Sequence, residues 1–176
     1  MTYPGSLDWQ PTTDELVAAP VARALATFPR AEQVRAAPID ADLADTAQFC
    51  EKYDVLLEDS ANCVVIVGKR GPDVSFAACM ILATTRADVN GTVRRRLGAK
   101  KASFAAMADA VELSGMEYGG ITPIGLPPGW PILIDAAVLE RDIVVIGSGV
   151  RGSKLALPSG ALAELPGAEV IEGLAS

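Results

Sequence analysis

The sequence predicts a single α/β domain in which helices surround a mixed β-sheet. Residues 63–67 form a continuous apolar run rich in β-branched side chains, which is typical of a strand buried on both faces. Further strand-like runs alternate with helical patterns along the chain. The 176 residues, 50% of them hydrophobic, are enough to bury the core of one domain, and no linker divides them.

The chain nevertheless has two parts of different character. Residues 1–40 are expected to form an N-terminal helical extension, and residues 41–176 hold the strand-like runs and form the main domain. The extension could cover a pocket, pair with a second subunit or contact another protein. We expect one compact unit overall.

The N-terminal part carries a helix signal followed by a strand signal. Thr12 and Glu15 have the spacing of a capping box, and the apolar series over 16–28 predicts a helix that Pro20 would kink or split. Residues 33–39 predict a short strand.

The next segment predicts a helix and a hairpin. A helix is expected from about Asp45, with Phe49 and Tyr53 on one face. The buried run then continues through a turn at 69–73 into a second strand at 74–84, which together form a β-hairpin.

The remaining elements follow from capping and breaking residues. Asn90 is expected to cap a helix that ends before Gly98, and a further helix over 103–113 is expected to end at Gly115. The last elements are expected to be strands at 132–135, 143–146 and 155–157 and a helix from Ser159.

The composition excludes several classes of chemistry. The chain has no histidine, which excludes Ser-His-Asp and Cys-His catalysis and histidine-ligated zinc. Cys50, Cys63 and Cys79 lack metal-ligand spacing and are expected to be reduced core thiols. No metal and no cofactor are therefore expected.

The same composition indicates where the protein works. No run approaches the ~18 apolar residues that a membrane helix needs, and the N-terminus lacks the features of a signal peptide. We therefore expect a cytoplasmic protein without a membrane partner. The net charge of −7 argues against a general nucleic-acid coat, which would need clustered positive charge.

The loop Gly115–Pro131 is the first candidate for function. It is too rich in glycine and proline to be a helix or a central strand, and loops of this length are usually functional. Gly119 and Gly120 allow close backbone approach, and Pro123 fixes φ. The loop can thus present main-chain groups at the edge of a pocket. A purely structural Ω-loop is an equally good interpretation from composition alone.

Two glycine motifs are interpreted as turns. Gly147–Gly152 matches G-x-G-x-x-G, but the residues after it predict a strand and not the helix that a dinucleotide site requires. Gly68–Gly71 lacks the spacing of a P-loop.

Four segments together carry a family resemblance: 97–101 (LGAKK), 114–125 (SGMEYGGITPIG), 132–135 (ILID) and 149–152 (GVRG). In this order the chain resembles the YbaK/EbsC family over residues 43–172. That family includes the prolyl-tRNA synthetase editing domain and its free-standing relatives. The resemblance implies one α/β domain with a strongly curved mixed sheet. It also implies hydrolysis, in trans, of the ester bond of a mischarged aminoacyl-tRNA.

The resemblance assigns roles to the loop. The family's G-x-x-x-P motif falls on Gly119, Gly120, Ile121, Thr122 and Pro123. It implies that these residues form the catalytic loop, which lines the amino-acid pocket and holds the ester with main-chain groups. Fixed backbone donors lower the barrier of such a reaction by stabilising the developing oxyanion. A hydroxyl of the terminal adenosine can position the water, and the isoleucines of the loop favour a small amino acid.

Substrate contacts are expected elsewhere around the same pocket. The candidates are Thr46, Asn62, Asp135, Gly147, Ser148 and Gly149. For Asp135, a carboxylate that only caps the following turn is a nearly equal alternative.

One position departs from the family pattern. Much of the family has a lysine where this chain has Asn62, and an amide brings hydrogen bonds but no charge. Either the chain reads the tRNA end with Asn62 and other groups, or it is a catalytically inactive binding module for a tRNA end or a nucleotide-like ligand. Cys63 beside it has no histidine to activate it and is expected to belong to the core.

A short basic stretch completes the candidates. Arg94, Arg95, Lys100 and Lys101 could contact tRNA weakly, although a solvated helix face is the simpler interpretation. The expected partner is the 3′ end of an aminoacyl-tRNA, with a synthetase as a further candidate. Monomer and homodimer both remain open.

Overall fold

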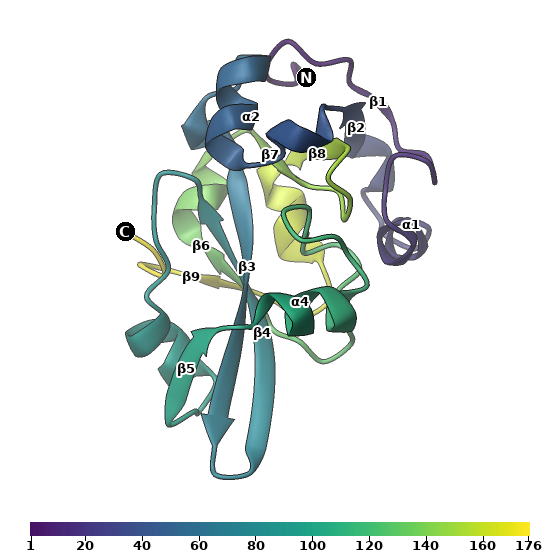
Figure 1. The fold of residues 1–176 in the computed structure, drawn as a ribbon. Helices are drawn as coiled ribbons and strands as arrows, with labels where there is room; N and C mark the ends of the chain where they lie inside the picture. The colour runs from purple at the N-terminus through teal and green to yellow at the C-terminus, as the bar shows by residue number, and fades with distance from the viewer.

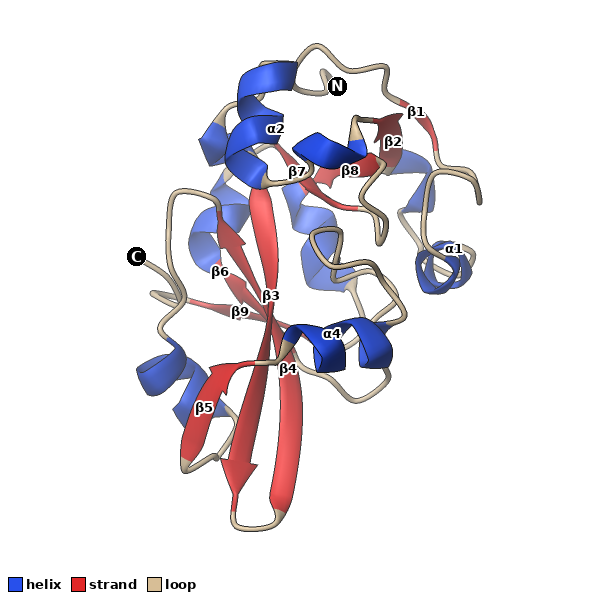
Figure 2. Ribbon diagram, viewed as in Figure 1, coloured by secondary structure: helices blue, strands red, loops and turns tan.

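The computed structural model of the protein describes all residues 1–176 and shows an α/β fold (Figures 1 and 2). The strands are β1 (Gln10–Pro11), β2 (Arg35–Pro38), β3 (Ala61–Arg70), β4 (Asp73–Leu82), β5 (Lys101–Phe104), β6 (Ile132–Asp135), β7 (Ile143–Gly147), β8 (Ser153–Pro158) and β9 (Ala168–Ile171). The helices are α1 (Ala19–Leu25), α2 (Thr46–Tyr53), α3 (Arg94–Arg96) and α4 (Met107–Ser114).

The strands form two sheets. One sheet has the order β1-β2-β8-β7 and is antiparallel throughout. The other has the order β5-β3-β4-β6-β9 and is mixed, because β6 runs parallel to both β4 and β9. The predicted α/β class is confirmed, but the single expected sheet is divided. An isolated parallel bridge between Ser60 and Val145 links the two sheets, and the largest core cluster contains residues of both, including Met80 and Ile146.

The β3–β4 hairpin is the longest feature of the fold. It pairs over ten residues of each strand, from Ala61 opposite Leu82 to Arg70 opposite Asp73, and its turn projects away from the rest of the molecule (Figure 1). The turn contains Gly71 at a φ of 58°, a left-handed conformation that glycine adopts without strain. The predicted hairpin is therefore confirmed.

The N-terminal helix begins later than the sequence predicts. Glu15 lies in a turn, Thr12 precedes that turn without regular structure, and α1 begins at Ala19, with Pro20 in its first turn. The capping-box prediction was wrong. Proline is favoured in the first turn of a helix, where a backbone N–H would have no intrahelical acceptor, and Pro20 occupies that turn. Pro20 is therefore part of the first turn of α1 and does not kink the helix.

The first forty residues are built into the fold. The predicted strand at 33–39 is confirmed as β2, which pairs antiparallel with β8. Val21 and Leu25 of α1 are buried in the largest core cluster, together with Ile146 and Leu155 of the four-stranded sheet.

Three further elements differ from the predictions. Residues 101–104 form strand β5, which pairs with β3. The helix expected over 103–113 therefore begins later, as α4 at Met107. Asp88, and not Asn90, caps the π-type turn before α3, because its carboxylate accepts from Gly91 N–H and Thr92 N–H. The two predicted glycine stops are present, since Gly98 and Gly115 both have positive φ.

The C-terminal end also differs. The helix expected from Ser159 is a single 3₁₀ segment, Ser159–Glu164, and strand β9 follows it. The strands predicted at 132–135, 143–146 and 155–157 are present as β6, β7 and β8. The strand predicted after Gly147–Gly152 is present as β8, so no helix N-terminus follows this glycine motif.

None of the helices has the length and apolar character required to cross a bilayer. No group of three or more histidine, cysteine, aspartate or glutamate side chains is arranged to hold a metal ion.

Candidate active site

A cavity of about 430 Å³ lies where the start of β3, the end of β7 and the start of β8 meet α2 and the loop after α4. Its lining comes from segments far apart in the sequence: Asp45, Thr46, Ser60, Ala61, Asn62, Cys63, Val64, Val65, Phe104, Ala105, Ala110, Tyr118, Gly119, Ile121, Val145, Ile146, Gly147 and Lys154. Five of the predicted site residues are in this set: Thr46, Asn62, Gly119, Ile121 and Gly147.

Two glycine-rich loops are hydrogen-bonded to each other at the wall of this cavity. Glu117 N–H donates to Gly149 O at 2.9 Å, and Gly149 N–H donates to Gly120 O at 2.7 Å. A Cβ on Gly147 would lie 2.5 Å from Gly120 O, and a Cβ on Gly120 would lie 2.7 Å from the Val150 backbone. We call this contact between residues 117–121 and 147–151 the loop clasp. Its glycines are required because the two backbones touch.

Arg151 joins the clasp from the outside. Its N–H donates to Glu117 Oε1 at 3.0 Å, and its guanidinium Nη1 donates to Tyr118 O at 3.2 Å. Gly119 has a φ of 86°, and a Cβ there would lie 2.4 Å from Arg151 Nη1. The loop is thus held in one conformation by contacts that a larger residue at 119 would displace.

Two main-chain donors of the loop remain available to a ligand. Gly120 N–H is engaged by Glu117 O at 3.0 Å, whereas Gly119 N–H and Ile121 N–H make no hydrogen bond to another residue. Both of these residues line the cavity. The next residue, Thr122, is completely buried, and its hydroxyl has no partner. The role of the loop as a source of backbone donors to a substrate stays a prediction.

The polar end of the cavity contains an amide that is already oriented. Thr46 Oγ1 donates to Asn62 Oδ1 at 2.8 Å, which leaves both hydrogens of the Asn62 amide without a protein partner. Thr46 begins α2, and Asn62 lies at the start of β3. The two predicted contacts therefore act as a pair, in which one residue fixes the donor face of the other.

Lys154 is the functional candidate that sequence reasoning missed. It lies on β8 and lines the cavity, but the residue is only 7% exposed. Its Nζ donates to Ala44 O at 3.2 Å and lies 5.1 Å from the centre of the Phe49 ring. Burial lowers the pKa of Lys154 below its usual value. A lysine inside the short apolar run Ser153–Pro158 was the available signal, because strand interiors rarely bury an ammonium.

The cysteine at the cavity is not an activated nucleophile. Burial raises the pKa of the Cys63 thiol, so at neutral pH it is protonated. Burial also raises the pKa of Cys79, to about 12. The expectation that these residues are reduced core thiols is supported by their free state and their apolar surroundings.

The remaining predicted contacts lie outside the cavity lining. The Asp135 carboxylate accepts from Leu174 N–H at 3.1 Å and so holds the C-terminal segment. The Ser148 hydroxyl is completely buried and lies 2.6 Å from the hydroxyl of Ser153, which also bonds to Leu16 O. Gly149 acts through the backbone of the clasp.

The basic stretch is at a distance from the cavity. Arg94 and Arg95 form part of α3, and Lys101 pairs with Lys69 near the hairpin turn. Lys69 lies seven residues along β3 from Asn62, about 23 Å at the usual rise of a strand. None of Arg94, Arg95, Lys100 and Lys101 lines the cavity.

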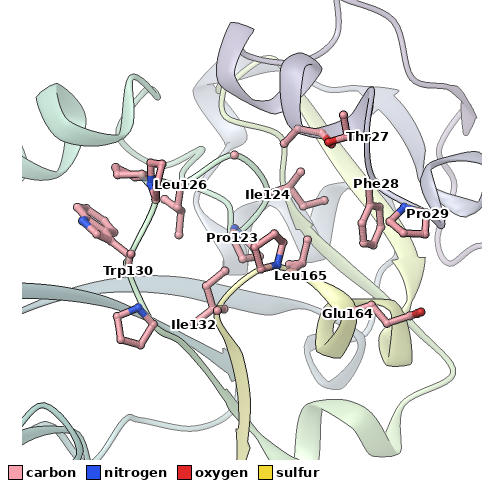
Figure 3. A pocket seen from close by; sticks show the side chains of 18 of the residues that line it. Thr27, Phe28, Pro29, Pro123, Ile124, Leu126, Trp130, Ile132, Glu164 and Leu165 are labelled. Atoms are coloured by element: carbon pink, nitrogen blue, oxygen red, sulfur yellow. The ribbon is translucent and has the colours of Figure 1, made fainter.

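A larger cavity of about 550 Å³ lies on the other side of the 115–131 loop. Figure 3 shows its wall, with Phe28 of the N-terminal segment opposite Leu126 and Trp130 of the loop. Pro123 lines this cavity and not the smaller one. Both charged residues at its edge are already paired: Arg96 with Glu169 at 2.6 Å and Glu164 with Arg30 at 2.9 Å. This cavity therefore has no unpaired charged side chain with which to bind a substrate.

Comparison with known proteins points to one family. The family model described as "Aminoacyl-tRNA editing domain" matches residues 40–165. A crystal structure of a "putative trans-editing enzyme for prolyl tRNA synthetase" superposes with a TM-score of 0.74 at 20% identity, covering 89% of this chain and 97% of that one.

A structure of the hypothetical protein APE2540 superposes with a TM-score of 0.77 at 21% identity, covering 89% of this chain and 99% of that one. At these identities the superpositions establish the fold, and the family match establishes the membership. The chain belongs to the aminoacyl-tRNA editing domain family, and its enzyme class is that of an aminoacyl-tRNA hydrolase.

Proposed function

We propose that the protein hydrolyses, in trans, the ester bond of a tRNA mischarged with a small amino acid. The observation that carries this proposal is the pair of unengaged backbone donors, Gly119 N–H and Ile121 N–H, at the wall of a cavity that contains no activated nucleophile. Such donors stabilise the oxyanion that forms when water adds to an ester carbonyl.

The reaction needs no covalent intermediate with the protein. A water adds to the ester carbonyl, and the neighbouring ribose hydroxyl of the terminal adenosine positions that water. The resulting oxyanion accepts from the loop donors. The bond to the ribose oxygen then breaks, and that oxygen takes up a proton, which releases the amino acid and the intact tRNA. Holding the ester and the water together supplies much of the rate enhancement.

The size of the cavity supports a small amino acid. Its volume of about 430 Å³ must hold the ester and part of the terminal nucleotide. Ile121, Phe104 and Val145 contribute apolar walls and no side-chain hydrogen bonds for a polar substrate. Apolar pockets discriminate by size only modestly, which explains the value of a separate hydrolytic checkpoint in translation.

The partner in this proposal is the 3′ end of an aminoacyl-tRNA in the cytoplasm. The structural neighbour described as a trans-editing enzyme for prolyl-tRNA synthetase supports a synthetase as a further partner. The basic residues near the hairpin turn would contact the tRNA body weakly, at a distance from the ester.

A deacylation assay on a panel of mischarged tRNAs tests the proposal. Gly119→Ala introduces a methyl group against a flexible arginine tip and strains a positive φ, so the protein should fold but the loop should shift. Wild type should release one small amino acid, and Gly119→Ala should lose most of this activity. Cys63→Ala should retain it. Full activity in Gly119→Ala, or loss in a folded Cys63→Ala, would contradict the proposed chemistry.

A second candidate function is a binding module that holds a tRNA end without hydrolysis. The specific observation in its favour is Asn62, an uncharged residue where much of the resembled family has a lysine. This candidate predicts tRNA binding by wild type with no release from any member of the panel. Activity that appears only in Asn62→Lys would show that the missing charge at this position is responsible.

A further inference from the structure

Lys154 is a buried cation with no carboxylate partner. The residue is 7% exposed, and the salt bridges of the protein involve only Arg30, Arg96 and Arg141 as cations. One of its three N–H donors is used by Ala44 O, and the Phe49 ring covers the ammonium. Two donors are therefore left on a charge that borders the cavity.

A buried charge without a counter-ion is strongly unfavourable unless something compensates it. The carbonyl of Ala44 and the ring of Phe49 supply part of that compensation. If this position served packing alone, an apolar side chain would stabilise the fold more than a lysine. The ammonium thus indicates that the cavity binds a negatively charged oxygen.

The start of α2 points to the same ligand chemistry. The N–H groups of Thr46, Ala47 and Gln48 in its first turn make no hydrogen bond within the chain. Ala44 O, the carbonyl that would accept from Gln48 N–H, accepts from Lys154 instead. A helix N-terminus favours anions through its free N–H groups and its dipole. Helix start, ammonium and Asn62 amide thus present donors to one cavity.

Two further charges act on this ammonium. Asp45, the residue before α2, also lines the cavity and attracts it, whereas Arg151 of the loop clasp repels it. Cys50 on α2 is the remaining titratable neighbour. Asp45 lies beyond 4 Å from Lys154, since the two form no salt bridge, so Asp45 moderates the positive potential without neutralising it.

We infer that Lys154 supplies, from strand β8, the positive charge that this chain lacks at Asn62, and that it binds an anionic oxygen of the aminoacyl-tRNA end. The inference rests on the proposed function for the identity of the ligand. The oxygen has two possible sources: a phosphate of the terminal nucleotides, or the oxyanion of the reacting ester.

The test compares Lys154→Met with the matched control Lys52→Met, which removes an exposed lysine from α2. The binding probes are the trinucleotide CCA and adenosine, which lacks phosphate. If the bound oxygen belongs to a phosphate, Lys154→Met should weaken CCA binding by about tenfold to hundredfold, the range expected for a charged hydrogen bond, and leave adenosine binding unchanged. Asp45→Asn should tighten CCA binding, because it removes the opposing charge.

Kinetics on a hydrolysed member of the tRNA panel separate the two sources. Weaker CCA binding with a raised KM supports the phosphate, whereas unchanged CCA binding with a lowered kcat supports the oxyanion. The double variant Lys154→Met/Asn62→Lys should recover the lost function, since it returns a cation to the same cavity from strand β3. Unchanged binding and unchanged kinetics in a folded Lys154→Met would overturn the inference.

The binding arm is independent of the proposed function. If wild type hydrolyses no tRNA but binds CCA through Lys154, the deacylase proposal fails and the charge assignment stands. If wild type is an active deacylase and Lys154→Met behaves like Lys52→Met, the charge assignment fails alone.

Discussion

At Lys154 the requirement for ligand binding and the requirement for stability conflict. Its ammonium is desolvated and has no counter-ion, so replacing it with methionine, which is apolar and similar in length, should stabilise the fold. We expect the free energy of unfolding of Lys154→Met to exceed that of wild type by about 1–3 kcal/mol at neutral pH. Denaturant unfolding measures this difference, with Lys52→Met as the surface control. A destabilised Lys154→Met would show that its contacts with Ala44 and Phe49 outweigh desolvation.

The same residue predicts a pH dependence. Burial lowers the pKa of Lys154, so between that lowered value and the usual lysine pKa of about 10.4 the unfolded chain binds a proton that the folded chain does not. The Lys154 contribution to stability therefore rises with pH in that window. The buried thiols act in the opposite sense, since burial raises the pKa of Cys79 to about 12.

The measurement is thus the difference between wild type and Lys154→Met, in which the contributions of Cys63 and Cys79 cancel. The stability advantage of Lys154→Met should shrink as pH rises toward 10.4, the approximate unfolded-state pKa. A difference that is constant from neutral to alkaline pH would contradict the assignment of a buried, desolvated ammonium.

Thr122 carries a different residue-scale prediction. Its hydroxyl is completely buried and has no hydrogen-bond partner in the protein. Valine has the same shape without that hydroxyl, so Thr122→Val should be neutral or stabilising by about 1 kcal/mol. Thermal unfolding checks the stability, and the deacylation assay checks function. A large loss of stability would indicate that the hydroxyl is satisfied in solution.

Single residues were predictable from the sequence where the backbone requires them. Gly119 and Gly147 were singled out by their glycine-rich context, and their contacts explain that context. Asn62 and Thr46 were candidates, but their hydrogen bond could not be foreseen, because sixteen positions separate them in the sequence. Lys154 was missed because its burial depends on α2, a distant element that covers it.

At the scale of elements, the loop clasp is the feature on which the cavity depends. A Cβ at Gly147 would meet the carbonyl oxygens of Gly120 and Ile121 at 2.5 and 2.7 Å, and neither backbone can move without breaking the clasp. Gly147→Ala should therefore destabilise the protein by about 1–3 kcal/mol and abolish ligand binding.

Gly152→Ala is the matched control in the same turn. A Cβ at Gly152 meets nothing within 4 Å, and no positive φ is required there, so we expect a change within about 0.5 kcal/mol or a slight stabilisation. Thermal unfolding and CCA binding compare the two variants. Equal behaviour of both alanines would contradict the account of the clasp.

Elements with strong local signals were predictable, and elements defined by pairing were not. The β3–β4 hairpin, α2 and the glycine stops at 98 and 115 have apolar patterns or breakers that dominate their environment. Strand β5 was not predicted, and its last two residues were included in the helix expected over 103–113, because its pairing with β3 is a tertiary contact that a four-residue pattern does not indicate. Strand β9 was missed for the same reason, since it depends on pairing with β6.

At the scale of the whole molecule, the α/β class was predictable from alternating strands and helices, but its division into two sheets was not. Residues 1–40 supply seven of the 22 buried residues of the largest core cluster, including Val21 and Val34. They also supply β2, which covers one edge of β8. The integration of residues 1–40 depends on tertiary pairing and packing. Their sequence, which predicts an extension, does not reveal it.

Removal of residues 1–40 is therefore expected to abolish cooperative folding. The truncated chain would expose β8 and the face of the core on which α1 packs, a loss far larger than the usual net stability of a domain. Circular dichroism during thermal unfolding measures this. A truncated protein with a sharp transition near that of wild type would show that 41–176 is an independent domain.

The central claim is that the cavity bounded by the loop clasp hydrolyses an aminoacyl ester without a side-chain nucleophile. The most direct measurement is the first-order rate constant for deacylation of each member of a mischarged tRNA panel by excess wild-type protein, beside the uncatalysed rate in the same buffer. The account predicts that at least one ester of a small amino acid is hydrolysed about 100-fold faster than without protein, as expected for fixed oxyanion donors. Decay of every ester at its uncatalysed rate, while the protein is folded and binds CCA, would contradict it.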